Sequence, residues 1–284
     1  MAEHALDLLA RLTAAFDQPQ PAPSPPAAAP ERARAAFVVG FPRSGTTLLG
    51  RLLASRPGVS VLEERHLVGA GVAEYVDAPD GPAKLMAATE ADIARHRAEF
   101  FRRAAAQGAD QSATLIVDQT ALNTVYLPLI LKLFPEAPVV FAVRDPRDVV
   151  FACFRRMFAP NAFTMEMHTL GSTARLYDGF MRLAEIARSR LGFAPLDVRN
   201  EALIEDFDGQ TQRLCAHAGL AWDESIRAFQ HASQGRALVT RSAAQVRSGL
   251  SRESLGVWRR YREEMAPVLP ILEPWVRRFG YAEA

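Results

Sequence analysis

A cluster of glycine, hydroxyl-bearing and basic residues occupies positions 40–47 of the sequence. An apolar run at 36–39 precedes it and is typical of a buried parallel strand, and apolar residues at helical spacing follow from Thr46. A strand, a glycine-bearing turn and a helix N-terminus direct backbone N–H groups and the positive end of a helix dipole at one point. We therefore expect a phosphate-type anion site whose polar side chains come from Arg43, Ser44, Thr46 and Thr47.

The loop differs from the Walker A loop of NTPases, which has the pattern G-x-x-x-x-G-K-[ST]. Gly40 and Gly45 have the required spacing, but Thr46 stands in the position of the lysine, and the basic residue Arg43 lies earlier. An ordinary NTPase is therefore not expected. The alternative is a structural turn before a buried helix, but such a turn needs no arginine and hydroxyl side chains around its glycine.

Three further polar clusters each follow directly after an apolar run, at Glu63–His66, Asp118–Asn123 and Arg144–Asp148. In a parallel sheet the ligand lies beyond the carboxyl ends of the strands. We therefore expect these clusters to meet the 40–47 loop at one edge of a sheet. For Asp118 and Asn123, capping of the following helix is an alternative to lining a site.

The elements that must position these clusters follow from the hydrophobic pattern. Short apolar runs predict strands at 36–39, 59–62, 114–117, 139–143 and 196–198. Helical spacing predicts a helix beginning at 44–46 and further helices at 84–107, 122–134, 146–158, 170–190, 201–218, 223–233 and 254–278. This alternation predicts an α/β fold, a P-loop-like and mostly parallel sheet flanked by helices.

The chain divides into three parts by composition. Residues 1–17 contain a short amphipathic helix at 3–16, which is marginal alone and must dock on something. Residues 18–34 form a linker rich in proline and alanine, with polyproline character. The compact domain then extends over residues 35–284, a length that can bury one large α/β core.

Composition and charge narrow the class of protein further. A net charge of +1 gives no support for nucleic acid or an anionic membrane as a partner. Cys153 and Cys215 are the only cysteines, which excludes a disulfide scaffold and fits a reducing compartment. The acidic N-terminus does not resemble a signal peptide, and no apolar run reaches membrane-spanning length. We therefore expect a cytoplasmic protein.

Two stretches of the sequence resemble motifs of one enzyme family. Gly-Phe-Pro-Arg-Ser-Gly-Thr-Thr-Leu-Leu at 40–49 resembles the 5′-phosphosulfate loop of sulfotransferases that use 3′-phosphoadenosine-5′-phosphosulfate (PAPS). Val-Arg-Asp-Pro-Arg-Asp-Val at 143–149 resembles their 3′-phosphate segment. A third stretch resembles the C-terminal signature of the bacterial branch of this family, through Thr240, Ser242, Gln245, Val246, Arg247, Gly256, Trp258 and Tyr261. That branch is often fused to tetratricopeptide repeats and is similar to protein-tyrosine sulfotransferases.

The resemblance implies the sulfotransferase fold and in-line transfer of a sulfuryl group from PAPS to a hydroxyl of a small molecule or peptide, without a metal. It implies that Glu64 is the general base and that Arg43 lies against the sulfuryl group. Glu63 is the rival base, and Glu64 could instead be solvated or paired with Arg65. The residues implied to bind PAPS are Arg43, Ser44, Gly45, Thr46, Thr47, Arg144, Arg156, Ser242, Gln245 and Arg247.

The chain departs from the family pattern at four positions. Where the family has Lys, Ser, Tyr and a basic residue, this chain has Gln119, Ala152, Asn200 and Val257 respectively. Two alternatives therefore stay open: a degenerate, non-catalytic member that binds a nucleotide or a partner, and the same fold with another activated donor. Arg144 could also form an ion pair with Asp145 or Asp148 instead of binding phosphate. The sequence identifies neither the acceptor nor the oligomeric state of the protein, and it is compatible with a dimer.

Overall fold

The computed structural model describes residues 4–18, 33–229 and 254–282. Its centre is a five-stranded parallel sheet with the strand order β2-β3-β1-β4-β5. The strands are β1 (Arg34–Gly40), β2 (Val59–Glu63), β3 (Leu115–Gln119), β4 (Val139–Val143) and β5 (Leu196–Arg199). Each lies within two residues at either end of the run expected from the sequence, and the parallel arrangement confirms the expected fold class.

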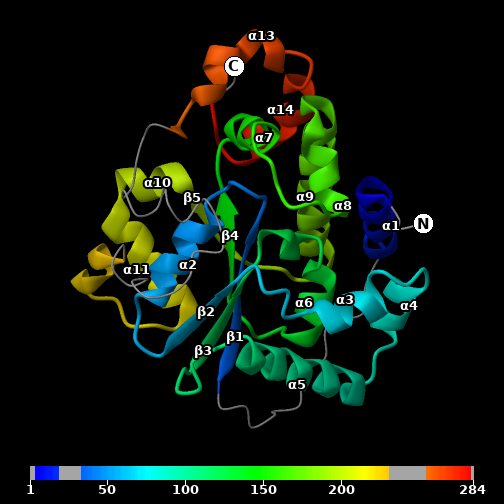
Figure 1. The fold of residues 1–284 in the computed structure, drawn as a ribbon, viewed down its shortest axis with the longest axis vertical. Helices are drawn as coiled ribbons and strands as arrows, with labels where there is room; N and C mark the ends of the chain where they lie inside the picture. The colour runs from blue at the N-terminus through cyan, green and yellow to red at the C-terminus, as the bar shows by residue number, and fades with distance from the viewer. Residues whose placement is uncertain (1–3, 19–32, 230–253, 283–284) are drawn as a thin grey trace.

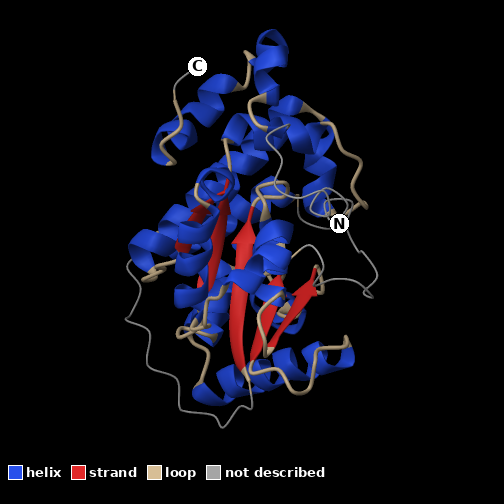
Figure 2. Ribbon diagram, turned by 90° about the vertical axis from the view of Figure 1, so that its left-hand side faces the viewer, coloured by secondary structure: helices blue, strands red, loops and turns tan. Residues whose placement is uncertain are grey.

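Helices cover both faces of the sheet, as Figure 2 shows. One face packs against a layer formed by α2 (Thr46–Ala54), α10 (Asn200–Glu205) and α11 (Phe207–Ala218). The other face packs against a larger layer that contains α3 (Gly69–Tyr75), α5 (Glu90–Ala106), α6 (Leu127–Leu133), α7 (Pro146–Phe154), α9 (Leu170–Arg190) and α14 (Leu269–Arg278). Because both faces are covered, the three central strands β3, β1 and β4 are buried at every position except Arg34, without alternation.

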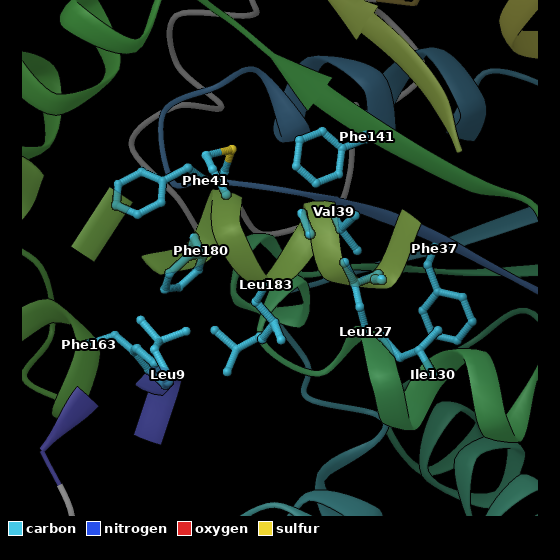
Figure 3. Close-up of a cluster of buried hydrophobic side chains, with 14 of the residues drawn as sticks. Leu9, Phe37, Val39, Phe41, Leu127, Ile130, Phe141, Phe163, Phe180 and Leu183 are labelled. Carbon is cyan, nitrogen blue, oxygen red and sulfur yellow. The ribbon is translucent and has the colours of Figure 1, made fainter. Parts of the chain in front are cut away.

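The core on the α9 side is rich in aromatic residues (Figure 3). Phe41, the first residue after β1, has its ring centroid 5.0 Å from that of Phe180 in α9, in an edge-to-face arrangement. Phe37, inside β1, lies 5.6 Å from Phe134 at the end of α6. These contacts fix the direction in which β1 delivers the loop that follows it.

The N-terminal helix α1 (Ala5–Phe16) lies beside α9 (Figure 1). Its apolar stripe is buried in the same core as the sheet, and Leu9 packs where Gly179 of α9 has no side chain. Arg11, on another face of the helix, donates to the carbonyl oxygens of Val76 and Ala78. The N-terminal helix, which is too short to be stable alone, therefore packs against the α9 side of the sheet domain of the same chain.

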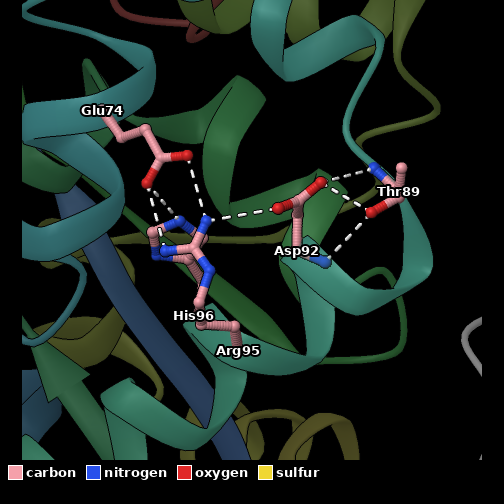
Figure 4. A network of polar contacts seen from close by, with 5 residues as sticks. All are labelled: Glu74, Thr89, Asp92, Arg95 and His96. Atoms are coloured by element: carbon pink, nitrogen blue, oxygen red, sulfur yellow. Dashed lines mark hydrogen bonds and ion pairs between the residues drawn. The ribbon is translucent and has the colours of Figure 1, made fainter.

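Long helices expected from the sequence are divided in the structure. The stretch 84–107 contains the end of α4 (Gly81–Met86) and the whole of α5, because Thr89 begins a new helix with a capping box. Figure 4 shows the reciprocal bonds between Thr89 and Asp92, and the Arg95 and His96 contacts with Glu74 that tie α5 to α3. The expected helix at 122–134 is instead the 3₁₀ turn η1 (Ala121–Thr124) followed by α6, where Pro128 occupies the first turn.

In the C-terminal half, the helices expected from the sequence are also divided or shorter. The expected helix at 201–218 is split into α10 and α11 at Asp206, which caps α11 by accepting from the Gly209 N–H. The expected helices at 146–158 and 223–233 are shorter, as α7 and the 3₁₀ turn η3 (Glu224–Ala228). The stretch 254–278 contains η5 (Val257–Tyr261), α13 (Arg262–Met265) and α14. Two short elements, α8 (Ala162–Met165) and η2 (Glu166–His168), precede α9.

Candidate active site

The loop after β1 has a backbone that requires glycine. Gly40 has φ 152° and Gly45 has φ 114°. A Cβ atom on Gly40 would lie 2.7 Å from Oγ of Ser44 and 2.8 Å from the carbonyl oxygen of Ala142. Gly45 is the N-cap of α2 and no side chain caps that helix, so its first N–H groups remain available to an anion.

The Ser44 hydroxyl, like the first N–H groups of α2, is available to an anion. The residue is 3% exposed, and its Oγ has no hydrogen-bond partner within the described residues. Thr46 and Thr47 are also buried, in the first turn of α2. A buried hydroxyl without a partner costs free energy unless a ligand completes its hydrogen bonds. The loop therefore fits a ligand with phosphate-type oxygens.

Three guanidinium groups lie close together at this loop, Arg43 within it and Arg144 and Arg156 on either side of α7. Burial, followed by the positive charges of Arg156 and Arg144, holds the pKa of Arg43 below its usual value. Arg144 reaches the loop directly: its Nη1 donates to the Arg43 carbonyl oxygen at 3.3 Å, and its Nη2 donates to the Ser254 carbonyl oxygen. Mutually repelling cations in a partly buried site favour an anion between them.

The acidic residues that follow Arg144 have partners of their own. Asp145 forms a buried, two-pronged ion pair with Arg147 at 2.8 and 2.9 Å. Asp148 accepts from the backbone N–H groups of Gly256 and Trp258, at 2.6 and 3.0 Å, and so holds the start of η5 on α7. The carboxyl group of Asp145 is thus paired with Arg147 rather than with Arg144.

Glu63, the last residue of β2, and Glu64, the residue after it, lie in different surroundings. Oε1 of Glu63 accepts a long hydrogen bond of 3.4 Å from Oγ1 of Thr47 in α2. Glu64 instead accepts from the Ala121 N–H at 3.3 Å, while its own N–H donates to the Gln119 carbonyl oxygen. Burial raises the pKa of Glu64 to about 7, helped by the nearby Asp118 and Glu63 carboxylates and opposed by the Ala121 hydrogen bond. Glu64 therefore has the proton affinity that a general base needs near neutral pH.

Asp118, the residue before the end of β3, lies close enough to Glu64 to raise its pKa. It is fully buried, burial raises its pKa, and Oδ1 accepts from the Thr120 hydroxyl at 2.6 Å. It does not cap η1, whose N-cap is Thr120. The exposed His66 lies near enough to Asp118 to oppose the rise of its pKa. Arg43, Glu64 and His66 all have positive φ, a costly conformation for these residue types that concentrates at functional sites.

Two of the four positions that depart from the family pattern lie against α2. The Gln119 amide packs against Gly50, 2.8 Å from where a Cβ atom would be, and its Nε2 has no partner among the described residues. Oδ1 of Asn200, the first residue of α10, lies 3.2 Å from the equivalent position on Gly45. Ala152 and Val257 are half-buried, in α7 and at the start of η5.

Several residues of this region carried no sequence signal or a weak one. Thr124, in η1, bonds both backbone groups of Gly40. Glu201 accepts from the Asp145 N–H and from the Tyr281 hydroxyl, and so connects the C-terminal segment to the turn after β4. A polar residue soon after the expected fifth strand was a usable signal for Glu201, whereas nothing distinguished Thr124.

The structure describes most of the site residues expected from the sequence and brings them together, from the loop after β1, from the end of β2 and from the β4–α7 segment. Ser242, Gln245 and Arg247 lie outside the described residues. No group of three His, Cys, Asp or Glu side chains that could hold a metal ion occurs within residues 4–18, 33–229 and 254–282. In the same ranges, every helix is too short or too polar to cross a bilayer.

In α/β sheets of this kind, ligands bind beyond the carboxyl ends of the strands, where the anion loop, Glu63 and Glu64 lie. The sequence profile of the sulfotransferase family matches residues 35–224, which is more than half of the chain. The chain belongs to the sulfotransferase family. This match confirms the resemblance seen in the sequence.

Individual proteins are also similar to this chain. An uncharacterized protein of Aquifex aeolicus (strain VF5) is 28% identical over 256 residues, which cover 84% of this chain and 32% of that protein. The chain thus spans about a third of the length of this curated relative. Sulfotransferase STF9 from Mycobacterium avium shares the fold, with a TM-score of 0.53 and 14% identity over 89% of this chain and 78% of the other. The sulfotransferase domain of the Synechococcus PCC 7002 olefin synthase has a TM-score of 0.49 and 18% identity over 92% and 100%.

Proposed function

We propose that this protein transfers a sulfuryl group from PAPS to a hydroxyl group of a small molecule or a peptide. The observation that carries the proposal is the meeting of two features at the carboxyl edge of the sheet. One is the group of guanidiniums from Arg43, Arg144 and Arg156 around the open N-terminus of α2. The other is the carboxyl group of Glu64, whose pKa is about 7. Membership of the sulfotransferase family supports this interpretation.

The residues present fit a donor with two anionic ends. The backbone of 43–47 and the unpartnered Ser44 hydroxyl would hold the 5′-phosphosulfate, with Gly45, Thr46 and Thr47 adding N–H and hydroxyl donors. Arg144 and Arg156 would bind the 3′-phosphate. PAPS, when bound, supplies the activated sulfuryl group.

The side chains then have complementary tasks in the transfer. Glu64 accepts the proton of the acceptor hydroxyl as the new oxygen–sulfur bond forms and the bond from sulfur to the nucleotide phosphate oxygen breaks. By analogy with phosphoryl transfer, negative charge is spread over the peripheral oxygens in a loose transition state. Arg43 and the α2 N–H groups stabilise that charge without a metal ion. Positioning of the two reactants supplies the rest of the rate acceleration.

A binding-only protein is the second candidate, and Gln119 is the observation that favours it. This residue ends β3, is 2% exposed and brings an amide where the family has a lysine. An amide can donate a hydrogen bond to the transferring group but adds no charge. This loss, together with Ala152, Asn200 and Val257, favours a protein that binds the nucleotide with little or no transfer.

Two measurements distinguish these candidates. Isothermal titration with 3′-phosphoadenosine-5′-phosphate tests the anion site, and no detectable heat at high nucleotide concentration would disprove both candidates. Transfer of labelled sulfate from PAPS to a panel of alcohols, phenols and tyrosine peptides tests the reaction. Transfer that is lost in Glu64→Gln supports the enzyme, whereas nucleotide binding without transfer to any acceptor supports the binding-only protein. A thermal-shift screen of other nucleotides would reveal a different donor.

A further inference from the structure

The side chain of Thr124 bonds to both backbone groups of Gly40, the residue at which β1 turns into the anion loop. Oγ1 of Thr124 accepts from the Gly40 N–H at 2.9 Å and donates to the Gly40 carbonyl oxygen at 2.7 Å. Thr124 is fully buried, so water does not compete for these bonds. A single hydroxyl thus satisfies two buried backbone groups that lie 84 positions away in the sequence.

The strand register explains why Gly40 needs this partner. β1 pairs with β3 only as far as Val38 opposite Gln119, because β3 ends there. On its other side, β1 continues along β4 to Gly40 opposite Ala142. Thr124 therefore replaces the missing strand partner on the β3 side, where unpaired and buried backbone groups would destabilise the turn.

The same 3₁₀ turn also holds the carboxylate. The N–H of Ala121, at the first residue of η1, donates to Oε1 of Glu64, and Glu64 is further fixed by its own N–H on the Gln119 carbonyl oxygen. The turn itself is fixed by the bond from the Thr120 hydroxyl to Asp118. Its first residue therefore contacts Glu64, and its last residue contacts the start of the anion loop.

We propose that Thr124 is a positioning residue, whose hydroxyl holds the anion loop at Gly40 in a fixed relation to the Glu64 carboxylate through the four-residue turn η1. The expected effect of Thr124 on catalysis rests on the proposed sulfuryl transfer. The role of Thr124 in holding the loop rests on the hydrogen bonds alone. Thr124 does not touch the reacting groups; it acts through Gly40 on the loop and through the shared turn on the relation between donor and base.

The test compares Thr124→Val, which keeps the shape and removes the hydroxyl, with Thr124→Ser, which keeps the hydroxyl. Amide hydrogen exchange of residues 40–47 in the unliganded protein should be at least tenfold faster in Thr124→Val and unchanged in Thr124→Ser. Thr211→Val is the matched control, because Thr211 is equally buried and its hydroxyl also both donates and accepts, on α11. It should lower the melting temperature without altering exchange in the loop.

Kinetics test the catalytic part. In Thr124→Val, kcat with PAPS should fall at least tenfold while the pH midpoint of kcat stays near 7, because the Ala121 bond to Glu64 is retained. Thr124→Ser should restore kcat. Loop exchange in Thr124→Val equal to that of the wild type, or a serine variant as impaired as the valine variant, would overturn the proposal. Absence of sulfate transfer in the wild type would disprove the proposed function, while the exchange measurements would still decide whether Thr124 positions the loop.

Discussion

Nη1 of Arg144 donates a hydrogen bond to the backbone carbonyl oxygen of Arg43, 3.3 Å away. The two residues come from the segments after β1 and β4, which are adjacent strands in the sheet. This contact brings two guanidinium groups to one loop, and Arg156, two residues after α7, adds a third charge that lowers the pKa of Arg43. The Asp145 carboxylate is bound to Arg147 rather than to Arg144, whereas Arg144 lies close enough to Asp148 to oppose the rise of the Asp148 pKa.

Replacement of Arg156 by glutamine should weaken nucleotide binding without unfolding the protein. Loss of one charge-assisted contact corresponds to about 1.5–3 kcal/mol, so the Kd for 3′-phosphoadenosine-5′-phosphate should rise about 10- to 150-fold. The melting temperature of the unliganded variant should stay the same or rise, because repulsion of Arg43 decreases. Arg155→Gln is the control: this neighbour stacks on Phe151 instead. Equal effects of the two substitutions on the titration would contradict the assignment.

Replacement of Glu64 by glutamine should remove the general base. We expect kcat to fall about 100- to 10,000-fold, since the amide cannot accept the hydroxyl proton. In the wild type, kcat should rise with pH through a midpoint near 7, the pKa of the buried carboxyl group. Glu63→Gln should retain a midpoint but shift it slightly downward, because the Glu63 charge helps to raise the Glu64 pKa and Glu63 itself contacts Thr47. A pH profile that loses its midpoint only in Glu63→Gln would exchange the two roles.

The same substitution should change the pH dependence of stability. In the folded protein Glu64 keeps its proton up to about pH 7, whereas in the unfolded chain it releases it near 4.5. The folded state binds more protons in this window, so the Glu64 contribution to the free energy of unfolding falls as pH rises from about 4.5 to 7. Glu64→Gln should therefore match the wild type at pH 4 and exceed its stability at pH 8 by on the order of 3 kcal/mol. Denaturant unfolding at the two pH values measures this difference in stability. Equal stabilities of the two proteins at pH 8 would show that burial does not destabilise the ionised Glu64 carboxylate.

The central fold could be predicted from the sequence because it depends on local patterns. The run at 139–143 is β4 without any change of bounds, and the glycines of the 40–47 loop predicted its sharp turn. Helix ends were predicted less well, since they depend on single capping contacts. Thr89 divides the helix expected at 84–107, for example, through its reciprocal bonds with Asp92.

The site was predictable only where polar residues follow strands directly. Arg144 and Glu64 fall at such positions, so strand order alone brings their segments to one edge of the sheet. Thr124 could not be found in this way, because its importance arises from the point at which β3 stops pairing with β1. The difference between Glu63 and Glu64 was equally hidden, since it depends on the partner that each carboxylate contacts, the Thr47 hydroxyl for Glu63 and the Ala121 N–H for Glu64.

Replacement of Gly40 by alanine should disable the anion loop. The added Cβ atom would lie 2.8 Å from the Ala142 carbonyl oxygen, which is backbone of the central sheet and cannot move aside. We expect a loss of about 2 kcal/mol or more in stability and no detectable nucleotide binding by titration. Gly108→Ala is the control for backbone strain alone, because Gly108 has φ 85° and nothing within 4 Å of the added atom. Both variants should lose about 1–2 kcal/mol from the positive φ, but only Gly40→Ala should lose the nucleotide.

Replacement of Gln119 by lysine should show whether the neutral amide limits the reaction. The Gln119 side chain lies at the end of β3 against Gly50 of α2, the helix whose N-terminus forms the anion loop. A charged amine there would stabilise the negative charge of the transition state, so kcat should rise about tenfold or more if transfer occurs. The buried ammonium should also lower the stability of the unliganded protein, and bound nucleotide should restore part of it.

Gln119→Met is the control for this substitution, because it keeps the length of the side chain without its polar end. It should leave kcat at or below the wild-type value. A lysine variant that binds 3′-phosphoadenosine-5′-phosphate more tightly but still transfers no sulfate would place the defect elsewhere, at the acceptor side or at Glu64. A lysine variant with restored transfer from an inactive wild type would instead identify residue 119 as the position at which a binding protein and an enzyme of this fold differ.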